Sequence, residues 1–255
     1  LKREETMAST FKPITQNDVV ATRTMLHEAI PITGSIPSGT YANSANIKTY
    51  THGMFESVFD YPYLSASANH IFDLTVGYAA SSDLSASSNT QNSKKINIYN
   101  QMAQILVGHD ITGAVLTFDQ NGDLLEAGGG IKYPEAIFMS FSRLLVKDEI
   151  KKGTFEMRVG VGDNHASPFE HMAVIKDLNA QNDYRVNSPA GEYAVLYVSN
   201  STNSSALTSS QVDEADISTE VQTTSNSYAC GLVYYQAGIV VLSPKLFYQA
   251  PGSTS

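Results

Sequence analysis

Charge, cysteine and tryptophan are all scarce in this sequence, and each shortage excludes a class of protein. Only 16% of the 255 residues are charged, against roughly 25% in ordinary soluble proteins. Acidic side chains outnumber basic ones by 25 to 16, which gives a formal net charge of −9. We therefore expect no direct nucleic-acid partner, because such binding depends on Lys and Arg side chains that neutralise phosphates.

The single cysteine excludes an internal disulfide and any multi-cysteine metal site. We interpret Cys230, at the start of an apolar strand, as a small packed hydrophobe. No run approaches the ~18 apolar residues of a spanning helix, and no basic start followed by an apolar segment indicates secretion. We therefore expect no membrane insertion.

Hydroxyl side chains are abundant instead, with 29 Ser and 20 Thr. They concentrate at about 80–95 and 200–228, and we expect polar loops at both places. The second stretch also carries acidic residues but has no apolar pattern, so it indicates either disorder or a contact surface. Its acidic residues are Asp213, Glu214, Asp216 and Glu220.

Apolar periodicity predicts a mainly β (α+β) fold, an antiparallel sandwich-like body with one main helix. Alternation along the chain predicts strands at 71–78, 137–142, 155–161, 193–199, 231–236 and 239–242. Three- and four-residue spacing predicts a helix at about Lys95–Val107, with Asn92 or Ser93 as its cap and Gly108 at its end.

Two weaker patterns complete the body. The spacing of Leu144–Ile150 predicts a short second helix that Gly153 ends. The pair Asn121-Gly122 favours a tight turn, so we expect Ile111–Phe118 and the segment after the turn to form a hairpin.

We divide the chain into an extended N-terminal arm, residues 1–50, and a single β-rich body, residues 51–255. Residues 1–6 precede a Met and are interpreted as a tag, a leader or a misassigned start. Prolines disfavour long regular elements in the arm, although a short helix at Asn17–Ile30 is an alternative. Its apolar residues would be buried on a partner surface: Phe11, Ile14, Leu26, Ile30, Ile32 and Ile36.

The motifs that carry chemistry are absent or incomplete. Gly34–Gly39 lacks the glycine spacing of a nucleophile elbow. Asp119–Asp123 with Glu126 departs from the calcium-binding hand, and a hairpin turn with solvated acids explains it. We interpret a further group as ordinary polar residues, namely Asp163, His165, Glu170 and His171. We therefore predict no enzyme, and no catalytic, cofactor-binding or metal-binding residues.

Tyrosines are the remaining candidates for a functional surface. We interpret four of them as lining a core edge or an interface, where tyrosine is enriched. These are Tyr61, Tyr63, Tyr234 and Tyr235.

Several stretches resemble virion structural proteins of large contractile-tailed bacteriophages, especially marine and cyanobacterial ones. They are Leu26–Ile36, Asp60–Leu64, Ser67–His70, Lys95–Ala103, Phe141–Gly153 and Tyr234–Leu242. The resemblance implies a virion component that assembles by contact with its own copies and with other virion proteins. It carries over no catalytic residues.

We expect this component in the tail or baseplate region of the virion, assembled in the host cytoplasm. A head or neck component or a capsid decoration protein is one alternative, and a host-surface-binding module of the tail fibre apparatus is another. A wall-cutting or polysaccharide-cutting enzyme carried on the tail is the third class, and the missing motifs count against it.

Overall fold

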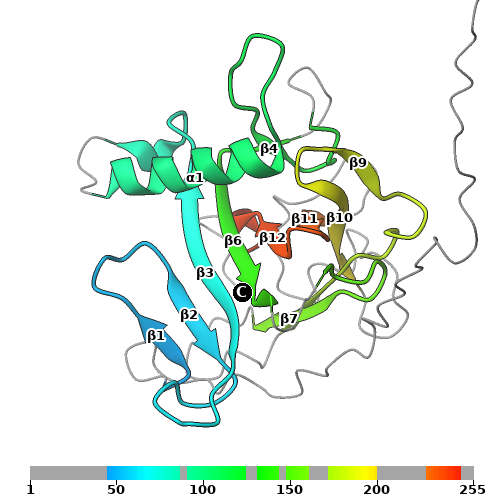
Figure 1. The fold of residues 1–255 in the computed structure, drawn as a ribbon. Coiled ribbons are helices and arrows are strands. Elements are labelled where there is room, and N and C mark those ends of the chain that lie inside the picture. Colours follow the sequence, from blue (N-terminus) through cyan, green and yellow to red (C-terminus); the bar gives the residue numbers. More distant parts are fainter. Residues whose placement is uncertain are drawn as a thin grey trace, which may run out of the picture.

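A computed structural model describes residues 45–86, 91–124, 131–143, 148–160, 172–199 and 228–247. Ten of the twelve strands in these residues form one antiparallel sheet (Figure 1), which confirms the mainly β class. Its strands are β1 (Ile47–Thr49), β2 (Glu56–Phe59), β3 (His70–Tyr78), β6 (Glu135–Phe141), β7 (Glu156–Gly160), β8 (Met172–Lys176), β9 (Arg185–Ser188), β10 (Gly191–Ser199), β11 (Ala229–Tyr234) and β12 (Ile239–Leu242).

The order of the strands places the last two in the middle. The path runs β1-β2-β3-β6-β12-β11-β10-β8-β7, and β9 pairs with β10 beside it. Strands β11 and β12 pair with each other, while β12 also pairs with β6 and β11 with β10. The hairpin near the C-terminus therefore joins two halves of the sheet that come from earlier in the chain.

The strands predicted for the centre of the sheet are confirmed, and both of their faces are covered by buried side chains. In β6, Met139 belongs to one buried cluster, together with Leu196 of β10, whereas Phe138 belongs to the other, together with Tyr193. Successive side chains point to opposite faces of a strand, so each central strand contributes to both clusters. The sequence pattern of these strands is therefore apolar on both sides.

The sheet curls over the first of these clusters. Five strand spacings separate β6 from β7, which is about 24 Å across a flat sheet. Yet the ring of Phe141, at the end of β6, lies 6.1 Å from that of Phe155, just before β7. The curled sheet thus packs one part of itself against another, in the manner of a sandwich.

A β-bulge at Cys230 adjusts this curl. Leu196 pairs with Gly231 and Tyr197 with Ala229, so Cys230 is the extra residue. A Cβ on Gly231 would lie 2.2 Å from the carbonyl oxygen of Val241, so only glycine fits beside β12. Cys230 itself is fully buried, which confirms its packing role.

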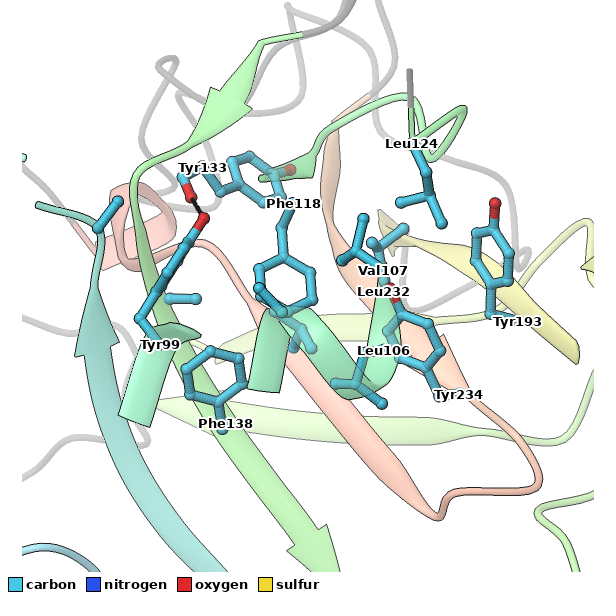
Figure 2. Packing of buried hydrophobic residues seen from close by; sticks show 14 of the residues in the cluster. Tyr99, Leu106, Val107, Phe118, Leu124, Tyr133, Phe138, Tyr193, Leu232 and Tyr234 are labelled. Atoms are coloured by element: carbon cyan, nitrogen blue, oxygen red, sulfur yellow. Dashed lines mark hydrogen bonds between the residues drawn. The ribbon is translucent and has the colours of Figure 1, made fainter. Parts of the chain in front are cut away.

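Part of the second face of the sheet is covered by the one α-helix among the described residues, α1 (Asn92–Leu106), which crosses β3 and β6 (Figure 1). A Cβ on Gly77 of β3 would lie 2.8 Å from the backbone nitrogen of Tyr99, so glycine allows this close approach. Tyr99 packs edge-on against Phe118 and donates its hydroxyl to the carbonyl of Tyr133 (Figure 2).

The end of α1 is confirmed and its start is corrected. Gly108, with φ of +96°, follows the last turn and donates its N–H to Ala103. The helix begins three residues before the predicted Lys95, and neither predicted residue caps it. The Asn92 amide instead donates to the carbonyls of Ser85 and Ala86, within and after the short 3-10 helix η2 (Asp83–Ser85).

The predicted hairpin around Asn121-Gly122 is largely wrong. Only β4 (Phe118–Asp119) forms from its first strand, and it pairs with β5 (Lys132–Tyr133). The Asp110 carboxylate accepts the N–H groups of Thr112 and Ala114, so a local turn replaces the strand. Gly122 does take the positive φ that the turn chemistry predicts.

The domain boundary also shifts. Strand β1 pairs with β2, and Asn46 is buried, so the body begins by residue 45 rather than 51. Tyr228 is buried in the core and does not belong to the polar stretch before it. The rest of that stretch, the predicted helix at 17–30, most of the predicted helix at 144–150 and the polar group at 163–171 lie outside the described residues. A second 3-10 helix, η5 (Pro244–Phe247), follows β12.

Candidate assembly surface

The connection between β2 and β3, residues 60–69, presents large apolar side chains to the outside. Leu64 is 86% exposed, Tyr61 57% and Tyr63 37%. Contiguous exposed apolar groups of this kind mark interaction sites more often than chance, and tyrosine is enriched at such sites. We name residues 60–69 the tyrosine loop.

Hydrogen bonds across its base fix the tyrosine loop. The Asp60 carboxylate accepts from the backbone N–H of Asn69 at 2.6 Å and from the Asn69 amide at 2.8 Å. The Asp60 N–H donates in turn to the Asn69 carbonyl. These bonds from Asn69, the side-chain bond foremost, lower the pKa of the Asp60 carboxyl because they favour its ionised form.

Residues 45 and 46 form hydrogen bonds with the other side of the tyrosine loop. The buried Asn46 amide donates to the carbonyls of Phe59 and Asp60, at 3.2 and 2.9 Å. The Tyr63 N–H donates to the Ala45 carbonyl at 2.9 Å. Residues 45 and 46 thus bind the tyrosine loop at the point where the described chain begins.

The ring of Phe59, the last residue of β2, contacts the tyrosine loop. The Phe59 ring lies 6.3 Å from that of Tyr63 and 5.4 Å from that of His70. A loop with a fixed backbone and a supported ring loses little conformational entropy when a partner binds. The tyrosine loop is therefore preorganised for contact.

A second aromatic group lies at the opposite end of β2. The rings of Tyr50, His52 and Phe55 contact one another, with centroids 5.0–5.1 Å apart, and Phe55 is 38% exposed. The ammonium of Lys48 lies over the Tyr50 ring, and that of Lys94 donates to the His52 carbonyl. This group is a second, separate aromatic cluster on the outer strands.

The predicted contact residues fall into three groups: exposed, buried and outside the described residues. Tyr61 and Tyr63 are exposed together, as an interface requires. Tyr234 and Tyr235 are fully buried in the two clusters of the chain's own core, so assigning them to an assembly surface is wrong. The arm residues Phe11, Ile14, Leu26, Ile30, Ile32 and Ile36 lie outside the described residues.

One polar cluster has the residue types of a hydrolase triad but not its geometry. The Asp73 oxygen Oδ1 accepts from Ser57 at 2.5 Å and lies 2.9 Å from His70 Nε2. In a nucleophilic triad the histidine stands between serine and carboxylate and takes the serine proton. Here the carboxylate stands between the other two, so this arrangement does not activate Ser57.

The acidic turn after β4 is not the solvated turn that the sequence predicts. Asp119 is fully buried, accepts the Leu124 N–H at 2.9 Å and lies 3.3 Å from the Lys132 ammonium. Burial, with Asp123 beside it, raises the pKa of the Asp119 carboxyl despite this cation. Among the described residues, no three His, Cys, Asp or Glu side chains gather as metal ligands.

Sequence reasoning found the tyrosines of the loop but missed its most exposed residue, Leu64, and its closing pair, Asp60 and Asn69. The signal for them was weak, since a Pro-containing polar stretch predicts a turn without predicting which side chains face outward.

Comparison with known proteins found no match to the chain among protein-family models, curated proteins or solved structures. Within the described part of the chain, no helix is both long and apolar enough to cross a membrane.

Proposed function

We propose that this chain is a non-enzymatic structural protein of a contractile-tailed bacteriophage, built into the tail or baseplate region by contacts with its own copies and with other virion proteins. The sequence resemblance supports the type of particle. The observation that carries the proposal is the tyrosine loop, which holds Tyr61 and Leu64 outward on a hydrogen-bonded frame.

Charge supports contact with proteins rather than with nucleic acid. With 16 basic side chains against 25 acidic ones, the chain has little capacity to neutralise phosphates. Interface cores are poor in charged residues and rich in tyrosine, and residues 61–68 carry no ionisable group other than tyrosine.

The test is self-association of the full chain and its loss on substitution of the tyrosine loop. We expect the chain to form a ring or larger assembly, seen by light scattering and electron microscopy. Replacing both Tyr61 and Leu64 by Ser removes two contact side chains, each worth about 1.5 kcal/mol or more when buried. We expect the assembly to weaken about 100-fold or more.

The control is Val186→Ser, because Val186 is 67% exposed but lies on β9, away from the loop. It should assemble like the parent. A chain that stays monomeric at high concentration contradicts the proposal. Binding to host cells or to preformed heads without self-association would instead favour the host-surface-binding or decoration alternatives.

A further inference from the structure

Basic side chains gather at the end of the body where helix α1 begins. The segments 45–56 and 91–106 are in contact there, because the Lys94 ammonium donates to the His52 carbonyl at 3.3 Å. Together the two segments carry three lysines and one acidic residue, namely Lys48, Lys94, Lys95 and Glu56. In a chain whose acidic residues outnumber its basic ones by 25 to 16, this end of the body is locally positive.

Exposed apolar side chains lie among these lysines, on the turn between β1 and β2. Met54 and Phe55 are both exposed. The turn is fixed, since the Gly53 N–H donates to the Tyr50 carbonyl and the Met54 N–H to His52 Nδ1, each at 3.0 Å. We name this surface the basic patch, and it consists of Lys48, Met54, Phe55, Lys94 and Lys95. Its complement is a protein surface that pairs a carboxylate with an apolar side chain.

The aromatic rings beside the basic patch favour a protein over a nucleic acid. The Tyr50 ring stacks on that of His52, with centroids 5.1 Å apart, and the Lys48 ammonium lies 4.9 Å from its centroid. Single-stranded nucleic acids bind by stacking bases on free aromatic faces along a basic groove. Here the ring of Tyr50 already contacts two neighbours of its own chain.

The described surface of the same chain carries the complement, just past the other end of α1. Ile111 is fully exposed there, and Asp110 beside it takes part in none of the salt bridges found within the described residues. The Asp110 carboxylate accepts from the Thr112 hydroxyl and from the N–H groups of Thr112 and Ala114, which fix the turn. These bonds lower the pKa of the Asp110 carboxyl, so it is charged at neutral pH.

One copy cannot join the two surfaces, because both belong to the described body and lie at opposite ends of α1. The helix has 15 residues, which makes it about 22 Å long. We infer that the turn at Asp110 and Ile111 of one copy docks on the basic patch of a second copy. Asp110 then faces a lysine, and Ile111 packs against Met54 and Phe55. The inference rests on the proposed function, since it names one contact through which copies assemble.

A contact of this kind is heterologous, because the turn and the basic patch are different surfaces of the same chain. Each copy keeps a free patch at one end and a free turn at the other. The contact therefore repeats from copy to copy, and it closes into a ring when the rotation between copies allows closure.

Cysteine cross-linking tests the inference in the full chain. The only native thiol, that of Cys230, is fully buried and its pKa is raised by burial, so it does not compete with introduced cysteines. A chain with Ile111→Cys is mixed with a chain with Met54→Cys under a mild oxidant. Thr51→Cys, at another exposed position of the same turn, is tested in place of Met54→Cys to cover the register of docking.

We expect a disulfide-linked dimer in which mass spectrometry finds position 111 joined to position 54 or 51. The controls are Ile105→Cys, on the exposed side of α1, and Leu84→Cys, beside the exposed Asp83. The yield with Ile111→Cys should exceed the yield with either control several-fold.

Charge reversal tests the electrostatic part of the contact. Lys94→Glu in the chain with Met54→Cys should lower the yield several-fold. Lys151→Glu makes the same change in net charge at an exposed residue outside the basic patch, and it should leave the yield unchanged. Raising the salt from about 0.05 M to about 0.5 M should also lower the yield, because salt screens exposed charges.

The outcomes separate the inference from the proposed function. A chain that assembles, yet links position 111 no better than position 105 or links position 84 instead, overturns the inference and leaves the proposed function standing. A link at position 111 that is as strong with Lys94→Glu also overturns it, because the contact then does not depend on charge. Absence of assembly in the parent chain overturns the proposed function, and the inference with it.

Discussion

Two buried aspartates show how single residues set the stability of this fold. Asp119 accepts one backbone N–H and lies beside Asp123, whereas Asp177 accepts the N–H groups of Gly153 and Phe155 and the hydroxyl of Tyr235. Burial raises the pKa of both carboxyls. Substitution of Asp177 therefore affects three donors that need its oxygens, whereas substitution of Asp119 affects one backbone N–H.

Asp119→Asn should flatten the dependence of stability on pH. A carboxyl whose pKa is raised by folding stabilises the protein fully below the unfolded pKa of about 4, and this contribution is lost as pH rises through the folded pKa. The amide does not titrate, its oxygen still accepts the Leu124 N–H, and its nitrogen can donate toward Asp123. We expect the variant to gain stability relative to the parent as pH rises above about 4, the unfolded pKa, measured by urea unfolding at a series of pH values.

Asp177→Asn is the matched comparison for that experiment. An amide has one acceptor oxygen, so either Gly153 or Phe155 would face a nitrogen that cannot accept its N–H. The cost of one unsatisfied buried group is about 1–3 kcal/mol, and we expect this variant to lose stability at neutral pH. Equal pH slopes in the parent and the Asp119 variant would contradict the assignment of the titration to Asp119.

At the scale of elements, helix α1 buries one of two adjacent apolar residues and exposes the other. Leu106 is fully buried against the sheet, while Ile105 beside it is 58% exposed. Helical geometry places adjacent residues about 100° apart, so one faces the strands and the other faces solvent.

We expect Leu106→Ala to destabilise the protein by about 2–5 kcal/mol, because it leaves a cavity between α1 and the sheet. Ile105→Ala should change the free energy of unfolding by no more than about 0.5 kcal/mol. Urea titration of both variants measures the difference, and similar losses would show that α1 does not pack on the sheet through Leu106.

The sequence allowed prediction of the elements that have a clear period. Strands β6 and β10 and helix α1 follow their apolar spacing, whereas β4 and β5, of two residues each, carry no period to detect. The pairing of β6 with β12 joins residues about a hundred positions apart, which no local pattern specifies.

The same reasoning explains which of the predicted contact residues are exposed. Tyr234 is the last residue of β11 and Tyr235 follows it at the start of the turn to β12. Side chains of adjacent residues in extended chain point to opposite faces, so beside a sheet with one covered face one of the two would be exposed. Here both faces are covered, and neither is exposed. Tyr61 and Tyr63 lie on a loop instead, where no second layer covers them.

At the scale of the whole molecule, stability depends on the two strands at the centre of the sheet. Without β11 and β12, β6 and β10 would each lose a partner, and both buried clusters would lose the side chains between them. A chain that ends at Ser199 should therefore show no cooperative thermal transition.

A chain that ends at Phe247 is the control, because it retains every described element. We expect it to keep the near-ultraviolet circular dichroism and the thermal transition of the full chain. A cooperative transition in the shorter chain would show that the preceding strands form a stable sheet by themselves.

The central position of the C-terminal hairpin also affects how the protein is made. Translation delivers β1 to β10 first, so the segments that form β6 and β10 lack their central partners until β11 and β12 leave the ribosome. Newly synthesised copies are therefore exposed to aberrant edge pairing with one another until β11 and β12 have been made. High expression should increase the demand for chaperones that shield those edges, and slower synthesis at lower temperature should raise the yield of native protein.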